Sequence, residues 1–308
     1  IAIMINNKDN KNWLDDMGVD PIEKTIKKIT LPRPGHADLA GIKKYDFDDI
    51  RNVIERSSAR ETAMRVALGA ICKKFLEDAN INISSRVVSI GSVSDNSIIK
   101  NYDNLNDRID SSPLRCYSKN IEEKMINEID KCSKKGDTIG GKIELIATGL
   151  PYGLGSYIQW DKKISTIISS LLLSINAFKG IEIGMGFDQA GEFGSKVHDE
   201  IGHDSEKYIR HSNNAGGIEG GMTNAQRVLA WVSMKPISTL VKPLNSVDYI
   251  TKEPKKAFKE RADSCAVPAA SIISESMMCI VLADAILEKF GGDSMNQLKM
   301  HMNSTAKY

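Results

Sequence analysis

Apolar residues return at helical spacing in three stretches of this chain. The first covers residues 46–79, where apolar side chains recur about every 3.6 residues and Asp46, Asp48 and Asp49 stand at the start. Acidic side chains favour a helix N-terminus because they complement the helix dipole. The pattern therefore predicts a long helix, built to be buried, over residues 46–79.

The other two stretches are residues 162–178, preceded by Asp161 as a candidate N-cap, and residues 268–290. The last stretch is apolar almost all round and stops at Gly291-Gly292, a pattern typical of a buried helix and its C-terminus. We therefore expect residues 268–290 to lie at the centre of the fold.

Short segments rich in β-branched residues fall between these helices and predict strands. They cover residues 86–93, 141–148, 181–187 and 228–234. Because no regular βαβ alternation links them, the pattern favours an α+β fold over a doubly wound parallel sheet. Residues 94–135 are polar and expected at the periphery, with a mobile loop over 107–115. No repeat or linker is visible, so a single domain over residues 1–308 is expected.

Composition narrows the possible partners. The chain has 308 residues, and its 41 Lys+Arg against 40 Asp+Glu give a net charge of +1, which argues against general binding to nucleic acid or a membrane surface. An anion site must therefore be local. The five cysteines form no CxxC pair, so neither a disulfide framework nor a zinc site is expected, and a reducing cytoplasm is the simplest location. The spacing of His198, His203 and His211 fits no metal site.

The most informative motif is RSSARETAMRVALGA, which begins at Arg56. Its hydroxyls, Ser57 and Ser58, can donate hydrogen bonds, and the guanidinium of Arg60 can clamp a phosphate or carboxylate. We therefore predict an anion site here. The alternative is an ordinary polar face in the middle of a helix, on which Glu61 pairs locally with Arg65.

Two further motifs suit anions. In LPRPGHADL, two prolines hold Arg33 in a preset backbone beside His36, which suits an anion and a proton donor; a surface turn is the alternative. In MKPIST, Lys235 precedes two hydroxyls in a run that could cradle a phosphate; a strand end with a proline turn is the alternative.

Two other motifs are weaker. RADSCAVP places Arg261 and Asp263 before the start of the third helix, where cation and helix dipole can act on an anion; the alternative is a helix cap. NNAGGIEGGMTN has four glycines in six residues, so its backbone could approach a ligand closely, but it fits neither GxGxxG nor a P-loop. A flexible loop is its alternative.

The order and spacing of these motifs closely resemble the chorismate synthase family. The matching segments are NKDNKNW, RPGHADL, RSSARETAMRVALGA, GLGSYIQWD, SINAFKGIEIG, NNAGGIEGGMTN, MKPIST and RADSCAVP with its following helix. The resemblance runs through nearly the whole chain.

This resemblance implies a helical layer between antiparallel sheets, a homotetramer, and a place in the shikimate pathway of aromatic amino acid biosynthesis. The implied reaction is the 1,4-anti elimination of phosphate from 5-enolpyruvylshikimate 3-phosphate, which gives chorismate and requires reduced FMN. NADPH is implied only as an indirect source of electrons, and an external flavin reductase is the default expectation.

The resemblance also implies roles for individual residues. His36 resembles the histidine that adjusts the protonation of reduced flavin. Asp263, expected to be buried beside Arg261, resembles the carboxylate that works with flavin N5 to remove the ring proton. The substrate anions would be bound by Arg33, Arg60 and Arg261. The FMN contacts would be Arg56, Ser57, Ser58, Asn176, Ala177, Gly220, Lys235, Pro236, Ile237, Ser238, Thr239 and Arg261.

The chain departs from the family pattern in two places. The family's Gly-Glu-Ser-His-Gly motif and Arg-rich stretch are not in this sequence, which begins at Ile1 inside a strand-like pattern. Ala262 stands where members often carry Ser. A flavin- or anion-binding module without turnover is therefore the alternative function for this polypeptide.

Overall fold

The computed structural model describes residues 1–18, 26–102, 104–257 and 263–305. The chain divides into two compact units, and each is described by itself. The first unit comprises Ile1–Met64 and Ser238–Ala262, and the second comprises Arg65–Ile237 and Asp263–Tyr308. The single domain expected from the sequence stays a prediction.

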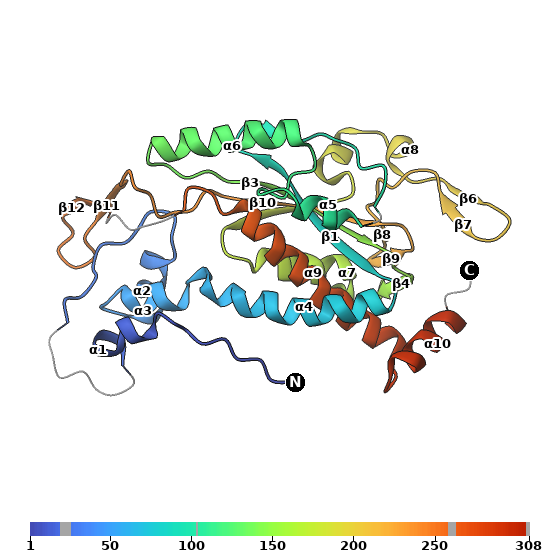
Figure 1. Ribbon diagram of the computed structural model, residues 1–308, viewed down its shortest axis with the longest axis horizontal. Coiled ribbons are helices and arrows are strands. Elements are labelled where there is room, and N and C mark those ends of the chain that lie inside the picture. The colour runs from blue at the N-terminus through green and yellow to red at the C-terminus, as the bar shows by residue number, and fades with distance from the viewer. Residues whose placement is uncertain (19–25, 103, 258–262, 306–308) are drawn as a thin grey trace. The chain divides into compact units, whose positions relative to one another are not determined.

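The first unit holds short helices and one hairpin (Figure 1). Its elements are η1 Asn10–Asn12, α1 Leu14–Met17, α2 Asp38–Tyr45, α3 Arg51–Arg56, η2 Ala59–Glu61, β11 Asn245–Val247 and β12 Pro254–Lys256. Its small core is formed by Ile42, Ile50 and Val53. A hydrogen bond of 2.7 Å from the Tyr249 amide to the Thr30 carbonyl ties the distant segments of the unit together.

The helix predicted over residues 46–79 is broken at two serines. α3 ends at Arg56, Ser58 is extended with ψ 133°, and α4 runs over Thr62–Asp78. Serine favours such breaks because its hydroxyl competes for backbone groups, and the Ser58 hydroxyl accepts a hydrogen bond from the Arg60 amide at 3.4 Å. α4 is also only partly buried, since Leu68 and Ile71 are exposed. The prediction of one continuous buried helix is therefore wrong.

The second unit is built on a five-stranded antiparallel sheet in the order β2-β1-β3-β10-β5 (Figure 1). Its strands are β1 Asn82–Ile90, β2 Val93–Ser94, β3 Gly141–Thr148, β5 Phe178–Ile183 and β10 Val228–Met234. The predicted strands 141–148 and 228–234 are confirmed at both ends. The other two predicted strands are confirmed with shifted bounds.

Helices and smaller sheets complete the second unit. They are α5 Leu105–Asp110, α6 Lys119–Lys134, β4 Tyr152–Gly155, η3 Trp160–Lys162, α7 Ile164–Leu173, η4 Gly186–Gly191, α8 Gly194–Val197, β6 Ile201–His203, β7 Tyr208–Arg210, β8 Ile218–Glu219, β9 Met222–Asn224, α9 Val267–Phe290 and α10 Met295–Thr305. α9 packs on β1, β3 and β4, and α7 packs on β5 and β9. The predicted α+β fold, with helices between antiparallel sheets, is confirmed.

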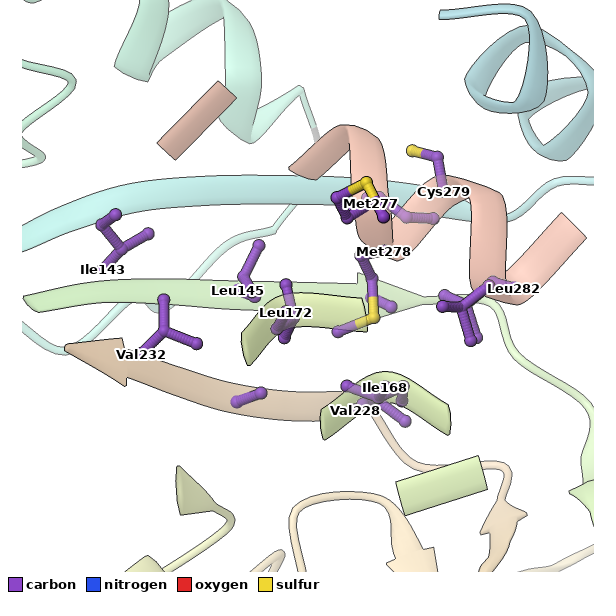
Figure 2. Packing of buried hydrophobic residues seen from close by; sticks show 14 of the residues in the cluster. Ile143, Leu145, Ile168, Leu172, Val228, Val232, Met277, Met278, Cys279 and Leu282 are labelled. Carbon is purple, nitrogen blue, oxygen red and sulfur yellow. The ribbon is translucent and has the colours of Figure 1, made fainter. Parts of the chain in front are cut away.

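α9 is the central helix that the sequence predicts. Met278 and Leu282 pack with Leu145 of β3 and Leu172 of α7 in one continuous core (Figure 2). Among the described helices, α9 is long and apolar enough to cross a membrane, but 72% of its most apolar window is buried inside the protein. Its apolar surface therefore serves the core of this unit.

α7 is shorter than the helix predicted over residues 162–178. It begins at Ile164 after Lys163, and Asp161, the predicted N-cap, lies in the preceding 3₁₀ turn. The prediction of Asp161 as the N-cap is therefore wrong. At its other end, the helix ends at Leu173, and the chain then turns through Ala177, whose φ is +67°, into β5.

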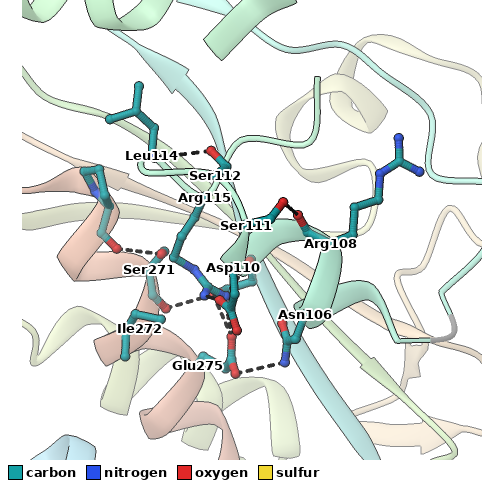
Figure 3. Close-up of polar contacts among 12 residues, drawn as sticks. Asn106, Arg108, Asp110, Ser111, Ser112, Leu114, Arg115, Ser271, Ile272 and Glu275 are labelled. Atoms are coloured by element: carbon teal, nitrogen blue, oxygen red, sulfur yellow. Dashed lines mark hydrogen bonds and ion pairs between the residues drawn. The ribbon is translucent and has the colours of Figure 1, made fainter. Parts of the chain in front are cut away.

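The polar stretch 94–135 forms two helices and a buried ion-pair network, so the predicted mobile loop over 107–115 is wrong. Arg115 is 6% exposed, and its guanidinium pairs with Asp110 and, at 3.0 Å, with Glu275 of α9 (Figure 3). Glu275 also accepts hydrogen bonds from Lys73 at 2.7 Å and Ser85 at 2.9 Å. Burial lowers the pKa of Arg115, and the charge of Glu275 opposes that shift.

Removing one partner from this network leaves the other charge buried and uncompensated. We expect Glu275→Ala to lower the free energy of unfolding by about 3–5 kcal/mol, measured by urea denaturation. Glu288→Ala, on the same helix, removes a carboxylate whose ion pair with Lys162 is exposed, and should change little. Equal effects of the two substitutions would contradict a stabilising role for the network.

Candidate functional site

The pairing of β10 with two strands gathers candidate residues at one edge of the sheet. β10 is antiparallel to both β3 and β5, so its last residue, Met234, lies opposite Gly141 and Phe178, the first residues of those strands. The segments that precede β3 and β5 therefore meet the segment that follows β10. We call residues 138–140, 176–177, 235–237 and 264–265 the sheet-edge cluster.

Hydrogen bonds hold the sheet-edge cluster together. The Lys235 amide donates to the Ala177 carbonyl at 3.0 Å, and the Thr138 hydroxyl donates to the Ile237 carbonyl at 2.6 Å. The Ile139 amide donates to the Ser264 carbonyl at 2.8 Å. Two segments predicted separately as FMN contacts, Asn176-Ala177 and Lys235–Ile237, are thus brought together.

Two backbone features tighten this cluster. A Cβ at Gly140 would lie 2.2 Å from the Met234 carbonyl oxygen, so only glycine allows the two chains to approach this closely. Ala177 adopts a left-handed conformation, with φ +67°, which costs a non-glycine residue about 1–2 kcal/mol. Such strain persists only where the surroundings enforce it, and it is frequent at functional sites.

Asp263 immediately precedes the cluster residue Ser264. Its side chain is exposed, so the expected burial is wrong, and Arg261, its expected neighbour, lies outside the described residues. The alternative role as a helix cap is also wrong, because α9 begins after Ala266, with no side-chain cap bond. The Asp263 carboxylate is therefore accessible to a ligand at the edge of the cluster.

Gly220 lies away from the sheet-edge cluster. It occupies the tight turn between β8 and β9, where it and Gly221 have φ values of +58° and +89°. Gly216, which lies four residues earlier and before β8, accepts a hydrogen bond from the amide of Leu229, at the opposite end of β10 from Lys235. The seven residues of β10 separate these ends by about 20 Å. The structure therefore does not group Gly220 with the other predicted FMN contacts of this unit.

In the first unit, Arg33 and His36 meet around a carboxylate that the sequence analysis missed. Asp38 is fully buried, and its Oδ2 accepts hydrogen bonds from the Arg33 amide at 3.0 Å and from Arg33 Nε at 2.9 Å. Its Oδ1 lies 2.5 Å from His36 Nδ1. Arg33 Nη1 also donates to the Thr239 hydroxyl at 3.1 Å. The signal was present in the sequence, where an acid follows Arg33 and His36 within six residues.

The Asp38 carboxyl is held in its ionised form. Burial opposes ionisation, but hydrogen bonds from His36 and Arg33 outweigh it and hold the pKa of Asp38 well below its usual range. The cavity beside Arg33 and Thr239 has a volume of about 10 Å³, the room of a single water molecule. Within this unit the Arg33 guanidinium thus faces protein partners, and its contact with a substrate stays a prediction.

The Arg56 motif presents its cations at the surface of the first unit. The Arg60 side chain is 70% exposed and pairs with Asp9 at 3.0 Å. Asp9 also accepts hydrogen bonds from Asn12 and Trp13, and these bonds together with that of Arg60 lower its pKa. The structure thereby joins NKDNKNW to the arginine motif, a contact that sequence spacing did not predict.

The other members of the Arg56 motif lie at the break between helices. Arg56 is exposed in the last turn of α3, and the Ser57 hydroxyl donates to the Ile54 carbonyl at 3.4 Å. Ser58 caps the short helix η2 that carries Arg60. Ser57 and Ser58 therefore do not lie in the middle of a helix, as the alternative expected, while the local pairing of Glu61 with Arg65 stays a prediction.

Comparison with known proteins assigns this arrangement to a family. The family model described as chorismate synthase matches residues 1–287. This chain belongs to the chorismate synthase family. Chorismate synthase is an enzyme of the shikimate pathway, and the family depends in general on a flavin.

Individual chorismate synthases agree closely with this chain. That of Alkaliphilus metalliredigens is 49% identical over 300 residues, which cover 97% of this chain and 79% of that protein. That of Aquifex aeolicus is 50% identical over 309 residues, which cover 97% and 78%. A crystal structure of chorismate synthase superimposes with a TM-score of 0.75 at 44% identity, over 88% of this chain and 76% of that one.

The lowered pKa of Asp38 makes the first unit sensitive to acid. An unfolded Asp titrates near pH 3.9, above the folded value, so the stabilisation is complete above about pH 4 and is lost as the pH falls further. We expect hydrogen-exchange protection of residues 33–45 to fall between about pH 4 and pH 2. Protection that stays constant over this range would contradict the role given to Asp38 in holding Arg33.

Proposed function

We propose that this chain catalyses the 1,4-anti elimination of phosphate from 5-enolpyruvylshikimate 3-phosphate, giving chorismate, with reduced FMN as cofactor. It would act as a carbon–oxygen lyase on a phosphate ester. Membership of the chorismate synthase family supports the reaction. The observation that carries the site is the hydrogen bond between Ala177 and Lys235, because it joins two segments that the family resemblance assigns to the flavin.

The residues present suit a flavin with its phosphate. In the second unit, Asn176, Ala177 and Lys235–Ile237 offer an amide, backbone groups and a cation, and the sheet-edge cluster fixes their positions. In the first unit, we assign the remaining contacts to Arg56, Ser57, Ser58, Ser238 and Thr239. We retain Gly220 and Arg261 as contacts on the family resemblance alone. When bound, reduced FMN supplies electron density that assists the departure of phosphate.

The substrate carries a phosphate and two carboxylates, so it requires cations that can change partners. Arg60 is suited to this task because its present partner, Asp9, is a solvated carboxylate, and an exposed ion pair of this kind is weak. Exchange of Asp9 for a substrate anion would desolvate the guanidinium and strengthen its hydrogen bonds. We assign Arg33 and Arg261 to the same substrate anions.

Elimination breaks a carbon–oxygen bond to phosphate and a carbon–hydrogen bond on the ring. We assign the removal of the ring proton to the Asp263 carboxylate, whose exposure leaves it accessible to a ligand. We assign a proton transfer to His36, whose side chain is 20% exposed while Nδ1 faces Asp38. The family resemblance further suggests a cytoplasmic homotetramer that receives reduced flavin from an external reductase, with NADPH as the indirect electron source.

Asp263→Asn tests the assignment of the base. In an anaerobic assay with reduced FMN and the substrate, we expect phosphate release to slow by about 10²–10⁴-fold, because an amide cannot accept the proton. FMN affinity should be unchanged, and Asp284→Asn, an exposed change on α9, should leave turnover intact.

Near-normal turnover by Asp263→Asn would remove this residue from the mechanism. Absence of phosphate release from the folded, unsubstituted chain with reduced FMN bound would contradict the proposed activity of the chain.

A further inference from the structure

The buried carboxylate of Asp38 lies where it can control the chemistry of His36. Asp38 opens helix α2 and is fully buried, and its Oδ1 lies 2.5 Å from His36 Nδ1. Arg33 donates three further hydrogen bonds to this carboxylate, from its backbone amide, Nε and Nη2. Both carboxylate oxygens are therefore engaged, and neither the sequence motif nor the family comparison assigns Asp38 a role.

The donors around Asp38 determine where the proton of neutral His36 resides. An ionised carboxylate only accepts hydrogen bonds, so the short contact with Oδ1 requires a proton on His36 Nδ1. Arg33 Nη2 lies 3.1 Å from His36 Nδ1 and 3.3 Å from His36 Nε2, so its position does not distinguish the two ring nitrogens. In neutral His36, the contact with Asp38 Oδ1 therefore places the proton on Nδ1 and the lone pair on Nε2.

We propose that Asp38 is a positioning residue, which fixes the orientation and tautomer of His36 so that Nε2 is the atom that gains and loses the catalytic proton. This inference rests on the function proposed above. When a proton reaches Nε2, the resulting imidazolium has the Asp38 carboxylate as its counter-ion on the other side of the ring.

The arrangement also explains why Arg33 is buried. Its guanidinium balances the charge of Asp38, so the carboxylate can remain ionised inside the protein. Arg33, His36 and Asp38 thus form a cluster in which Asp38 is the common acceptor. This arrangement does not depend on which ligand His36 contacts.

The tautomer of His36 tests the proposal without any activity assay. We expect nitrogen-15 NMR of the unsubstituted chain, above the titration of His36, to show the proton on Nδ1. In Asp38→Asn, we expect a mixture of the two tautomers, because the amide can either accept or donate. Asp48→Asn, which changes an exposed carboxylate of the same unit, is the matched control and should leave the spectrum of His36 unchanged.

The rate of turnover tests whether Asp38 acts on the reaction through His36. We expect Asp38→Asn to lower kcat by about 10–100-fold and to move the His36-dependent limb of the pH–rate profile to lower pH, because the imidazolium loses its counter-ion. If Asp38 acts through His36, the double variant with His36→Ala should be no slower than His36→Ala alone.

Two results would overturn the inference. A proton on Nε2 in the unsubstituted chain would exclude the proposed tautomer, whether or not Asp38→Asn folds. Full additivity of the Asp38 and His36 substitutions would show that Asp38 acts independently of His36. If the unsubstituted chain shows the Nδ1 tautomer but no turnover, the proposed function fails while the tautomer assignment stands.

Discussion

The antiparallel pairing of β10 with both β3 and β5 is the interaction on which the candidate flavin site depends. This pairing puts Met234 opposite Gly141 and Phe178, and so fixes which loops share an edge of the sheet. A shift of one residue in this register would turn the buried face of β10 outwards, so the core under α7 and α9 enforces it. The hydrophobic core thereby sets the position of Lys235 relative to Ala177, although neither residue contributes to that core.

Both units use buried polar groups to fix geometry, with different consequences. In the second unit, Glu275 accepts hydrogen bonds from Arg115, Lys73 and Ser85, and so connects α9 to distant parts of the chain. In the first unit, the Asp38 carboxylate contacts Arg33 and His36, which belong to the same sequence motif. The first arrangement connects elements of the fold, whereas the second leaves one edge of a titratable ring available for chemistry. Charge burial alone therefore does not distinguish a structural group from a functional one.

The sequence predicts those parts of the fold whose pattern is local and apolar. β3, β10 and α9 follow from β-branched runs and from an all-round apolar helix. α6 is missed because its segment is polar overall, although Ile121, Met125 and Ile129 recur at helical spacing and pack against the core. The ion pair of Arg115 with Glu275 joins residues 160 positions apart, a separation that no spacing rule reaches.

In the candidate site, too, the sequence predicts local motifs but not the contacts between residues that are far apart in the chain. The motifs identify the residue types, and the resemblance to the chorismate synthase family gives them roles, but the contacts of Asp9 with Arg60 and of Ala177 with Lys235 come only from the structure. For Gly220, the motif matches the family, but the structure separates this residue from Lys235 by the length of β10. Spacing along the chain cannot show which motifs share one edge of a sheet.

A crystal structure of the chain with reduced FMN, determined under anaerobic conditions, would test the flavin site most directly. We expect the flavin to contact both Ala177 and the Lys235–Ile237 segment of the sheet-edge cluster, with the hydrogen bond between Ala177 and Lys235 preserved. Flavin bound without contact to either segment would contradict the assignment of this edge as the cofactor site.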